Sequence, residues 1–266
     1  MQIRDLTIGY PGKALLKGIS FDIAPGECIL LAGPNGSGKT TLLRTLAGAI
    51  PPLHGSVPPV PGLAPGTVSP LPGSVPPFPG AASGAVSCIS ADAPRIVLLP
   101  TGIPKVKGFT VRGFIRTACY RESGWSGTLP PEAEQRMTEA LDMLGIADLT
   151  NRDISVLSDG QFQLACIASA LTRRADVLLL DEPTGFLDAD NRVLLLTTLR
   201  DLCRRTGLSV LFSSHDLHAS LQVADRVFAC TADGRFLASG PSGLSGPSSV
   251  DALTVLRAAF PAVEWN

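Results

Sequence analysis

The sequence is poor in charged residues and contains no long apolar run. Charged residues make up 17% of the 266 residues, below the roughly 25% that is usual for soluble domains, whereas hydrophobic residues make up 45%. This balance is typical of a globular chain with extra apolar surface for a partner to cover. No stretch approaches the roughly 18 consecutive apolar residues of a membrane helix, and the first ten residues lack the pattern of a signal peptide. We therefore expect a cytoplasmic protein.

The sequence also lacks an excess of either charge and lacks paired cysteine motifs. A formal net charge of −1 gives no reason to expect nucleic-acid binding, which is usually accompanied by a basic patch. The six cysteines are not arranged as CxxC pairs and have no histidines nearby: Cys28, Cys88, Cys119, Cys166, Cys203 and Cys230. We expect them to be small buried thiols in a reducing compartment.

Short apolar runs alternate with amphipathic segments along most of the chain. The first ten residues alternate like a strand, and buried strands are predicted at 28–32, 95–99, 177–180 and 209–213. Helices are predicted at 39–47 and 189–206, each followed by glycine, the second with Val193, Leu196, Leu199 and Leu202 at helical spacing. Asp233-Gly234 between two apolar runs predicts a hairpin. Strands alternating with helices indicate an α/β core.

Two segments differ from this pattern. Residues 108–157 contain two predicted helices, 111–119 and 131–144, and we expect a helical subdomain inserted in the α/β core. Residues 51–83 are rich in proline and glycine, and 55–62 return almost unchanged at 73–80. Because proline lacks the donor that a sheet interior needs, little regular structure is expected there. A surface excursion is favoured over a polyproline-II docking site for a partner.

A glycine-rich stretch between a predicted strand and helix fits the phosphate-binding pattern G-x-x-x-x-G-K-[ST]. Its glycines allow successive backbone N–H groups to face a polyanion, and the following helix directs its positive end toward the same phosphates. Lys39 is expected to reach the β- and γ-phosphates and Thr40 to bind Mg²⁺. A glycine-rich turn without a ligand is the alternative, and the flanking strand and helix disfavour it. The candidate nucleotide-binding residues here are Gly33, Pro34, Asn35, Gly36, Ser37, Gly38, Lys39, Thr40 and Thr41.

Two adjacent carboxylates follow the predicted strand at 177–180. Asp181 is expected to hold the metal, directly or through water, and Glu182 to orient and polarise the attacking water. An apolar run that ends in Asp-Glu is common and usually marks only a strand that meets a solvated loop. The pairing with Lys39 and Thr40 is what gives these carboxylates their significance.

The run Leu157-Ser158-Asp159-Gly160-Gln161 resembles the signature sequence of ABC ATPases, usually Leu-Ser-Gly-Gly-Gln, with Asp159 at the first glycine position. Ser158 is a natural helix cap and Gly160 allows close approach to an anion, although a capped helix start without a ligand would look the same. The order of the motifs makes the resemblance more specific. Across roughly residues 2–240 they follow one another as in ABC ATPases, in the order Tyr10, the phosphate loop, Leu157–Gln161, Asp181-Glu182, Gly185–Asp188 and Ser213–Asp216.

The resemblance implies a P-loop NTPase fold of the ABC ATPase type, with an antiparallel β portion near the N-terminus and an inserted helical subdomain. It implies an ATPase domain at 1–240 and a C-terminal extension at 241–266. Tyr10 would stack on adenine, Asp188 would belong to the loop that crosses a dimer interface, and His215 would contact the γ-phosphate.

By the same resemblance, ATP and Mg²⁺ would be bound between two copies arranged head to tail. Each phosphate loop would face residues Ser158, Asp159, Gly160 and Gln161 of the other copy. Transmembrane permease subunits would be the partners and a substrate-binding protein an indirect one, with no nucleic acid, and the chain would lie on the cytoplasmic face of the membrane.

The stretch around Thr110-Val111, Tyr120 and Gly124-Trp125 resembles importers of iron–siderophore complexes, haem and vitamin B12. Trp125 could equally pack the helical subdomain. A non-transport ABC ATPase acting on DNA or ribosomes is the alternative function, but the chain has neither the long heptad segments nor the second ATPase domain typical of those classes.

One residue departs from the family pattern. ABC ATPases usually have a glutamine after the strand that enters the helical subdomain, and here Leu99-Pro100 is followed by Thr101. A threonine hydroxyl is shorter than that side chain and would reach the metal site through a bridging water. Hydrolysis that is slower or differently coupled to transport is therefore expected, and a slowly hydrolysing nucleotide clamp is a third possible function.

Overall fold

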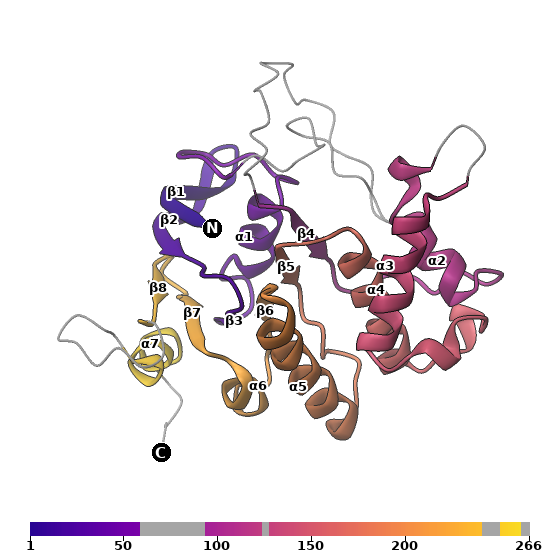
Figure 1. Ribbon diagram of the computed structural model, residues 1–266. Helices are drawn as coiled ribbons and strands as arrows, with labels where there is room; N and C mark the ends of the chain where they lie inside the picture. Colours follow the sequence, from indigo (N-terminus) through magenta and orange to yellow (C-terminus); the bar gives the residue numbers. More distant parts are fainter. Residues whose placement is uncertain (59–93, 124–127, 241–250, 262–266) are drawn as a thin grey trace.

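The computed structural model describes residues 1–58, 94–123, 128–240 and 251–261. At its centre lies a six-stranded sheet with the order β4-β5-β6-β3-β7-β8 (Figure 1). The strands are β3 (Cys28–Ala32), β4 (Ile96–Leu99), β5 (Val177–Leu180), β6 (Ser209–Ser213), β7 (Arg226–Cys230) and β8 (Phe236–Ala238). All neighbouring pairs are parallel except β7 and β8. The predicted α/β class is confirmed.

The central strands are apolar along most of their length because both faces of the sheet are covered. Every residue of β3, β5, β6 and β7 is buried. On one face pack α1 (Lys39–Leu46) and a separate antiparallel hairpin, β1 (Gln2–Tyr10) and β2 (Lys13–Asp22). On the other face lie α5 (Ala189–Thr206), α6 (Leu217–Val223) and α7 (Ala252–Ala259).

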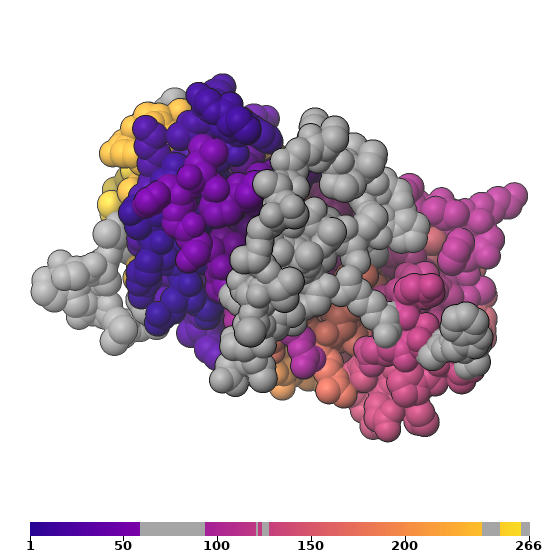
Figure 2. All heavy atoms as spheres, turned by 90° about the horizontal axis from the view of Figure 1, so that it is seen from above, coloured from indigo at the N-terminus to yellow at the C-terminus, as the bar shows by residue number. Residues whose placement is uncertain are grey.

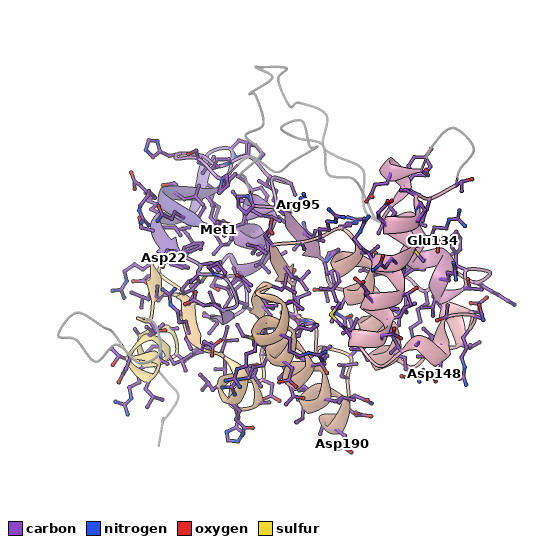
Figure 3. The ribbon with its side chains drawn as sticks, viewed as in Figure 1. Met1, Asp22, Arg95, Glu134, Asp148 and Asp190 are labelled. Atoms are coloured by element: carbon purple, nitrogen blue, oxygen red, sulfur yellow. The ribbon has the colours of Figure 1, made fainter. Side chains whose placement is uncertain are left out.

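Three helices form a lobe beside the sheet: α2 (Val111–Thr117), α3 (Pro131–Met143) and α4 (Asp159–Thr172). Short 3-10 turns, η1 (Tyr120–Glu122), η2 (Ala147–Leu149) and η3 (Ile154–Val156), lie between them. Figure 2 shows this magenta-to-pink lobe at the opposite end of the molecule from the indigo hairpin, and in Figure 3 Glu134 and Asp148 lie in the lobe whereas Met1 and Asp22 lie at the hairpin. Helix α4 also packs against β4 and α5, so it joins the lobe to the sheet.

Several details differ from the sequence predictions. Val193 is 51% exposed, because the buried stripe of α5 begins two residues later and consists of Leu195, Leu196, Leu199, Leu202 and Cys203. The first helix of the lobe ends at Thr117 and not at 119 as predicted, and β4 begins at Ile96 and not at 95. Helix α7 was not predicted, although Val255, Leu256 and Ala259 form its buried stripe.

The buried state of the cysteines is confirmed where the structure describes them, and some other predictions concern residues that it does not describe. Five cysteines are buried and free; Cys88, residues 59–83, Gly124 and Trp125 lie outside the described residues. His54 forms an isolated bridge to Thr7. No helix in the described part of the chain is sufficiently long and apolar to cross a bilayer.

Candidate active site

The phosphate loop is the connection from β3 to α1, at the carboxyl edge of the sheet. Gly33 has φ 150° and Gly38 has φ 98°, conformations that favour glycine. At Gly33 a Cβ atom would lie 2.4 Å from the carbonyl oxygen of Cys230, so β7 leaves no room for a side chain. The loop is therefore packed tightly against the sheet, and it continues directly into the start of α1.

Lys39 places a buried ammonium in the middle of this loop. The residue is 6% exposed, and Nζ donates to the carbonyl oxygens of Gly33 at 2.7 Å and Pro34 at 3.1 Å. Burial lowers the pKa of Lys39, and the nearby carboxylates of Asp181 and Glu182 oppose that shift. The loop thus carries a concentrated positive charge that is poorly solvated, which suits a polyanion.

Ser37 adds a second feature that fits a phosphate ligand. Its Oγ is buried and has no hydrogen-bond partner among the described residues. Buried hydroxyls are normally hydrogen-bonded, so this oxygen is suited to a ligand that the loop encloses. The loop residues therefore fit a triphosphate.

Asp181, which follows β5, forms the centre of the candidate metal site. One carboxylate oxygen, Oδ1, accepts from the hydroxyl of Thr40 at 3.2 Å and from that of Ser213 at 3.0 Å. The residue is almost fully buried. Carboxylate and hydroxyl oxygens at the edge of a phosphate loop are the hard ligands that Mg²⁺ prefers, so these residues fit the metal.

Glu182 is held by its backbone and by a histidine. Its φ is 50°, a left-handed conformation that costs free energy for a residue other than glycine and tends to persist at functional sites. Its N–H donates to Ser213 Oγ at 2.8 Å, and its Oε1 lies 2.5 Å from His215 Nε2. The turn holds the carboxylate at the same edge of the sheet as Asp181.

Thr101 lies near these groups, but its hydroxyl points to the main chain. Thr101 Oγ1 donates to the carbonyl oxygen of Asp181 at 2.7 Å. The side chain thus supports the turn that carries both carboxylates. Tyr10 ends β1 and is 49% exposed, on the hairpin whose second strand packs against Gly38.

The first turn of α4 is separated from this cluster. Ser158 and Gln161 form a capping box, in which the Gln161 N–H donates to Ser158 Oγ at 3.2 Å and the Ser158 N–H donates to Gln161 Oε1 at 3.1 Å. Gly160 packs against the side chain of Asn191, and the Asn191 N–H donates to the carboxylate of Asp188. Within the described parts of the chain, no hydrogen bond or ion pair joins 158–161 to 33–41.

Two supporting residues were not assigned a role from the sequence. Ser213 connects Asp181 to Glu182, and its position at the end of β6, beside β5, is the signal that could have identified it. Arg192 lies 2.7 Å from Asp216 Oδ2 and also donates to the carbonyl oxygen of Leu187. Its guanidinium holds the pKa of Asp216 below its usual value, and it joins the Asp188 loop to the His215 loop.

The comparisons with known proteins agree with this geometry. The family model described as ABC transporter matches residues 16–185. A zinc import ATP-binding protein of Jannaschia sp. is 31% identical over 90% of this chain and 84% of its own length. An achromobactin transport ATP-binding protein of Dickeya dadantii is 29% identical over 85% and 77%.

A solved structure described as a metal-chelate type ABC transporter in an inward-facing conformation superposes with a TM-score of 0.72 at 22% identity, covering 98% of this chain and 88% of that one. This likeness concerns the fold. The matched family model and the relatives agree with the phosphate loop and with the carboxylates at the sheet edge. The chain therefore belongs to the ABC transporter family, and it is an ATP-binding subunit with ATPase activity that uses ATP and Mg²⁺.

Proposed function

We propose that this chain powers an importer by hydrolysing ATP at the carboxyl edge of its sheet, working as a head-to-tail pair against membrane-spanning permease subunits. The observation that supports this most strongly is the convergence of Lys39, Thr40, Asp181 and Glu182 at one edge of the sheet. Thr40 and Ser213 both donate to Asp181, and the Glu182 N–H donates to Ser213. The side chains come from two segments distant in the sequence, 39–40 and 181–182, and they meet where a phosphate loop needs them.

In the proposed reaction, Lys39 leaves the carbonyl oxygens that it contacts here and neutralises the β- and γ-phosphate oxygens. Thr40 and Asp181 hold the metal. Thr101 contributes to the metal site by supporting the turn that carries Asp181. Bound Mg²⁺ would supply positive charge to the phosphate oxygens during transfer.

Glu182 accepts a proton from the attacking water, which adds to the γ-phosphorus while the bond to the β-phosphate oxygen breaks. His215, beside Glu182, is positioned to contact the γ-phosphate when its imidazole moves off the carboxylate. Tyr10 offers a ring for adenine at the open end of the hairpin.

The second copy supplies the remaining contacts. The helix end at Ser158–Gln161 presents backbone N–H groups and the positive end of α4, yet among the described residues no hydrogen bond or ion pair joins it to 33–41. We place it over the triphosphate bound by the partner copy, with Asp188 at the interface between the two. Two nucleotides would then favour the closed pair because only the closed pair completes both sites.

For the cargo, we propose a metal chelate of the iron–siderophore, haem or cobalamin type. The achromobactin relative and the stretch around Thr110 and Tyr120 support this class, whereas the zinc relative supports a free metal ion. In the assembly the chain would lie on the cytoplasmic face of the membrane, and a substrate-binding protein would deliver the cargo.

The test uses the full chain and its permease reconstituted in proteoliposomes. We expect MgATP hydrolysis that Lys39→Ala abolishes and Lys17→Ala, an exposed lysine on β2, leaves intact. Uptake of a radiolabelled ferric siderophore, but not of radiolabelled zinc, would support the cargo class. Uptake of zinc alone would overturn the cargo class, and a Lys39→Ala variant as active as the wild type would overturn the site.

A further inference from the structure

Lys105 lies against the start of α4 although it belongs to the segment that follows β4. Its Nζ is 2.7 Å from Asp159 Oδ1 and donates to the carbonyl oxygen of Leu157 at 2.7 Å. The ammonium also lies 5.7 Å from the centre of the Phe162 ring. Three contacts from one ammonium fix it at the helix end.

The position of Asp159 makes this contact more than a surface ion pair. It is the first residue of α4, at the position where the related signature sequence has glycine. An α-helix carries roughly half a positive charge at its N-terminus, so a carboxylate there would leave the end with a net charge of roughly −0.5, which repels a triphosphate. Adding the ammonium of Lys105 returns the net charge to roughly +0.5.

The same segment also reaches the metal carboxylate. Four residues before Lys105, Thr101 donates to the carbonyl oxygen of Asp181. Residues Thr101, Lys105, Asp159 and Asp181 line one hollow between the lobe and the sheet. This segment therefore contacts both the turn that carries Asp181 and the start of α4.

We propose that Lys105 is a positioning residue whose ammonium compensates Asp159, so that an aspartate-bearing helix end accepts the triphosphate bound by the partner copy. The inference rests on the proposed function and adds to it a residue for which no role is otherwise apparent. It also explains how the helix end tolerates an acid in place of glycine.

The experiment measures MgATP hydrolysis by the full chain as a function of ATP concentration, for Lys105→Met, Asp159→Asn and the double variant. Lys105→Met roughly keeps the length of the side chain and removes its charge together with the hydrogen bond to the Leu157 carbonyl oxygen. We expect its KM for ATP to rise about tenfold, with a smaller change in kcat, because one uncompensated charge faces the phosphates. In the double variant, loss of the carboxylate restores KM to within about threefold of the wild type. Lys107→Met, an exposed neighbour, is the matched control and stays at the wild-type value.

Ionic strength gives a second readout that a purely structural role would not affect. The KM difference between Lys105→Met and the wild type should shrink between about 0.1 and about 1 M salt, where the screening length falls from about 10 to about 3 Å. If Lys105→Met proves unstable, Lys105→Gln repeats the comparison.

A KM for Lys105→Met equal to that of Lys107→Met, or an increase that Asp159→Asn does not reverse, would overturn the inference while the proposed function stands. Absence of hydrolysis by the wild-type chain, with or without its permease, would instead count against the proposed function.

Discussion

The two halves of the proposed nucleotide site are built differently. The half at the sheet edge is connected within one chain: Thr40, Ser213 and Thr101 all donate to Asp181, and Glu182 pairs with His215. The half at the start of α4 is satisfied locally, by its own capping box and by Lys105. The first half is organised by the sheet, whereas the second is a helix end that makes no hydrogen bond to the described phosphate loop of its own chain.

This difference shows what each half needs in order to work. Strand ends fix the sheet-edge half, so its chemistry depends on hydrogen bonds between neighbouring strands. In the proposed pair, the helix-end half would depend on charge and on where a second copy places it. Substitutions in the first half should therefore affect turnover, and substitutions in the second should affect the ATP concentration needed.

Glu182→Gln should give the largest effect on the first half. The amide cannot take a proton from water, so turnover should fall by about 10²- to 10⁴-fold while MgATP binding persists. The variant should accumulate as an ATP-bound dimer, measured by light scattering after size exclusion. Glu132→Gln on α3, which is exposed, is the control. Rapid turnover by Glu182→Gln would show that another group is the base.

Ser213→Ala should be the next largest. It removes the donor to Asp181 and leaves the Glu182 N–H without an acceptor, so we expect about 1–3 kcal/mol lower unfolding free energy and about tenfold slower turnover. The matched control is Ser220→Ala, which removes a buried hydroxyl that has no partner in the described structure and should change little. Equal behaviour of the two variants in chemical denaturation and ATPase assays would contradict the role of Ser213 in supporting Asp181 and Glu182.

Thr101→Val tests the departure from the usual glutamine. The substitution keeps the shape and removes the bond to the Asp181 carbonyl, so turnover should fall about threefold with roughly 1 kcal/mol lower stability. Thr138→Val on α3, whose hydroxyl also donates to a main-chain carbonyl, is the control. Turnover by Thr101→Val equal to that of Thr138→Val would contradict a role for Thr101 in supporting the carboxylates.

Arg192→Met should give the smallest effect, and its size depends on pH. Because the pKa of Asp216 is lowered in the folded chain by Arg192, the pair stabilises the fold above the ordinary pKa of aspartate, and this is lost as pH falls through the folded pKa. Both side chains are about a third exposed. We therefore expect Arg192→Met to lower the free energy of unfolding by at most about 1 kcal/mol at neutral pH.

Denaturant unfolding at neutral and acidic pH measures this difference, which should shrink in acid. Arg205→Met, at the exposed far end of α5, should show no comparable pH dependence. A difference for Arg192→Met that grows in acid would contradict the assigned ion pair.

The sequence was most informative where a function requires a local pattern. The phosphate loop could be identified because its glycines, Lys39 and Thr40 fall within one short run, 33–40, between a strand and a helix. Asp181 and Glu182 could be placed at the same edge because both follow a buried strand. Interactions across the fold were not accessible in this way: the strand order results from crossovers, and nothing near Thr101 indicates that its hydroxyl turns to a carbonyl oxygen.

Periodicity also has a physical limit that α5 illustrates. Val193 continues the apolar spacing of Leu196 and Leu199, yet it lies in the first turns, before the buried stripe of the helix begins, and stays exposed. The partner of Lys105 could not be predicted either, because the chain between it and Asp159 includes α2 and α3, whose packing determines the contact.

The most direct measurement is a structure of the Glu182→Gln variant with MgATP bound. We predict two copies head to tail, with the Ser158 N–H end of each within hydrogen-bond distance of the γ-phosphate that Lys39 of the other copy holds. A nucleotide-bound structure in which the Ser158 end contacts no phosphate, and no second copy can bring it there, would contradict this prediction.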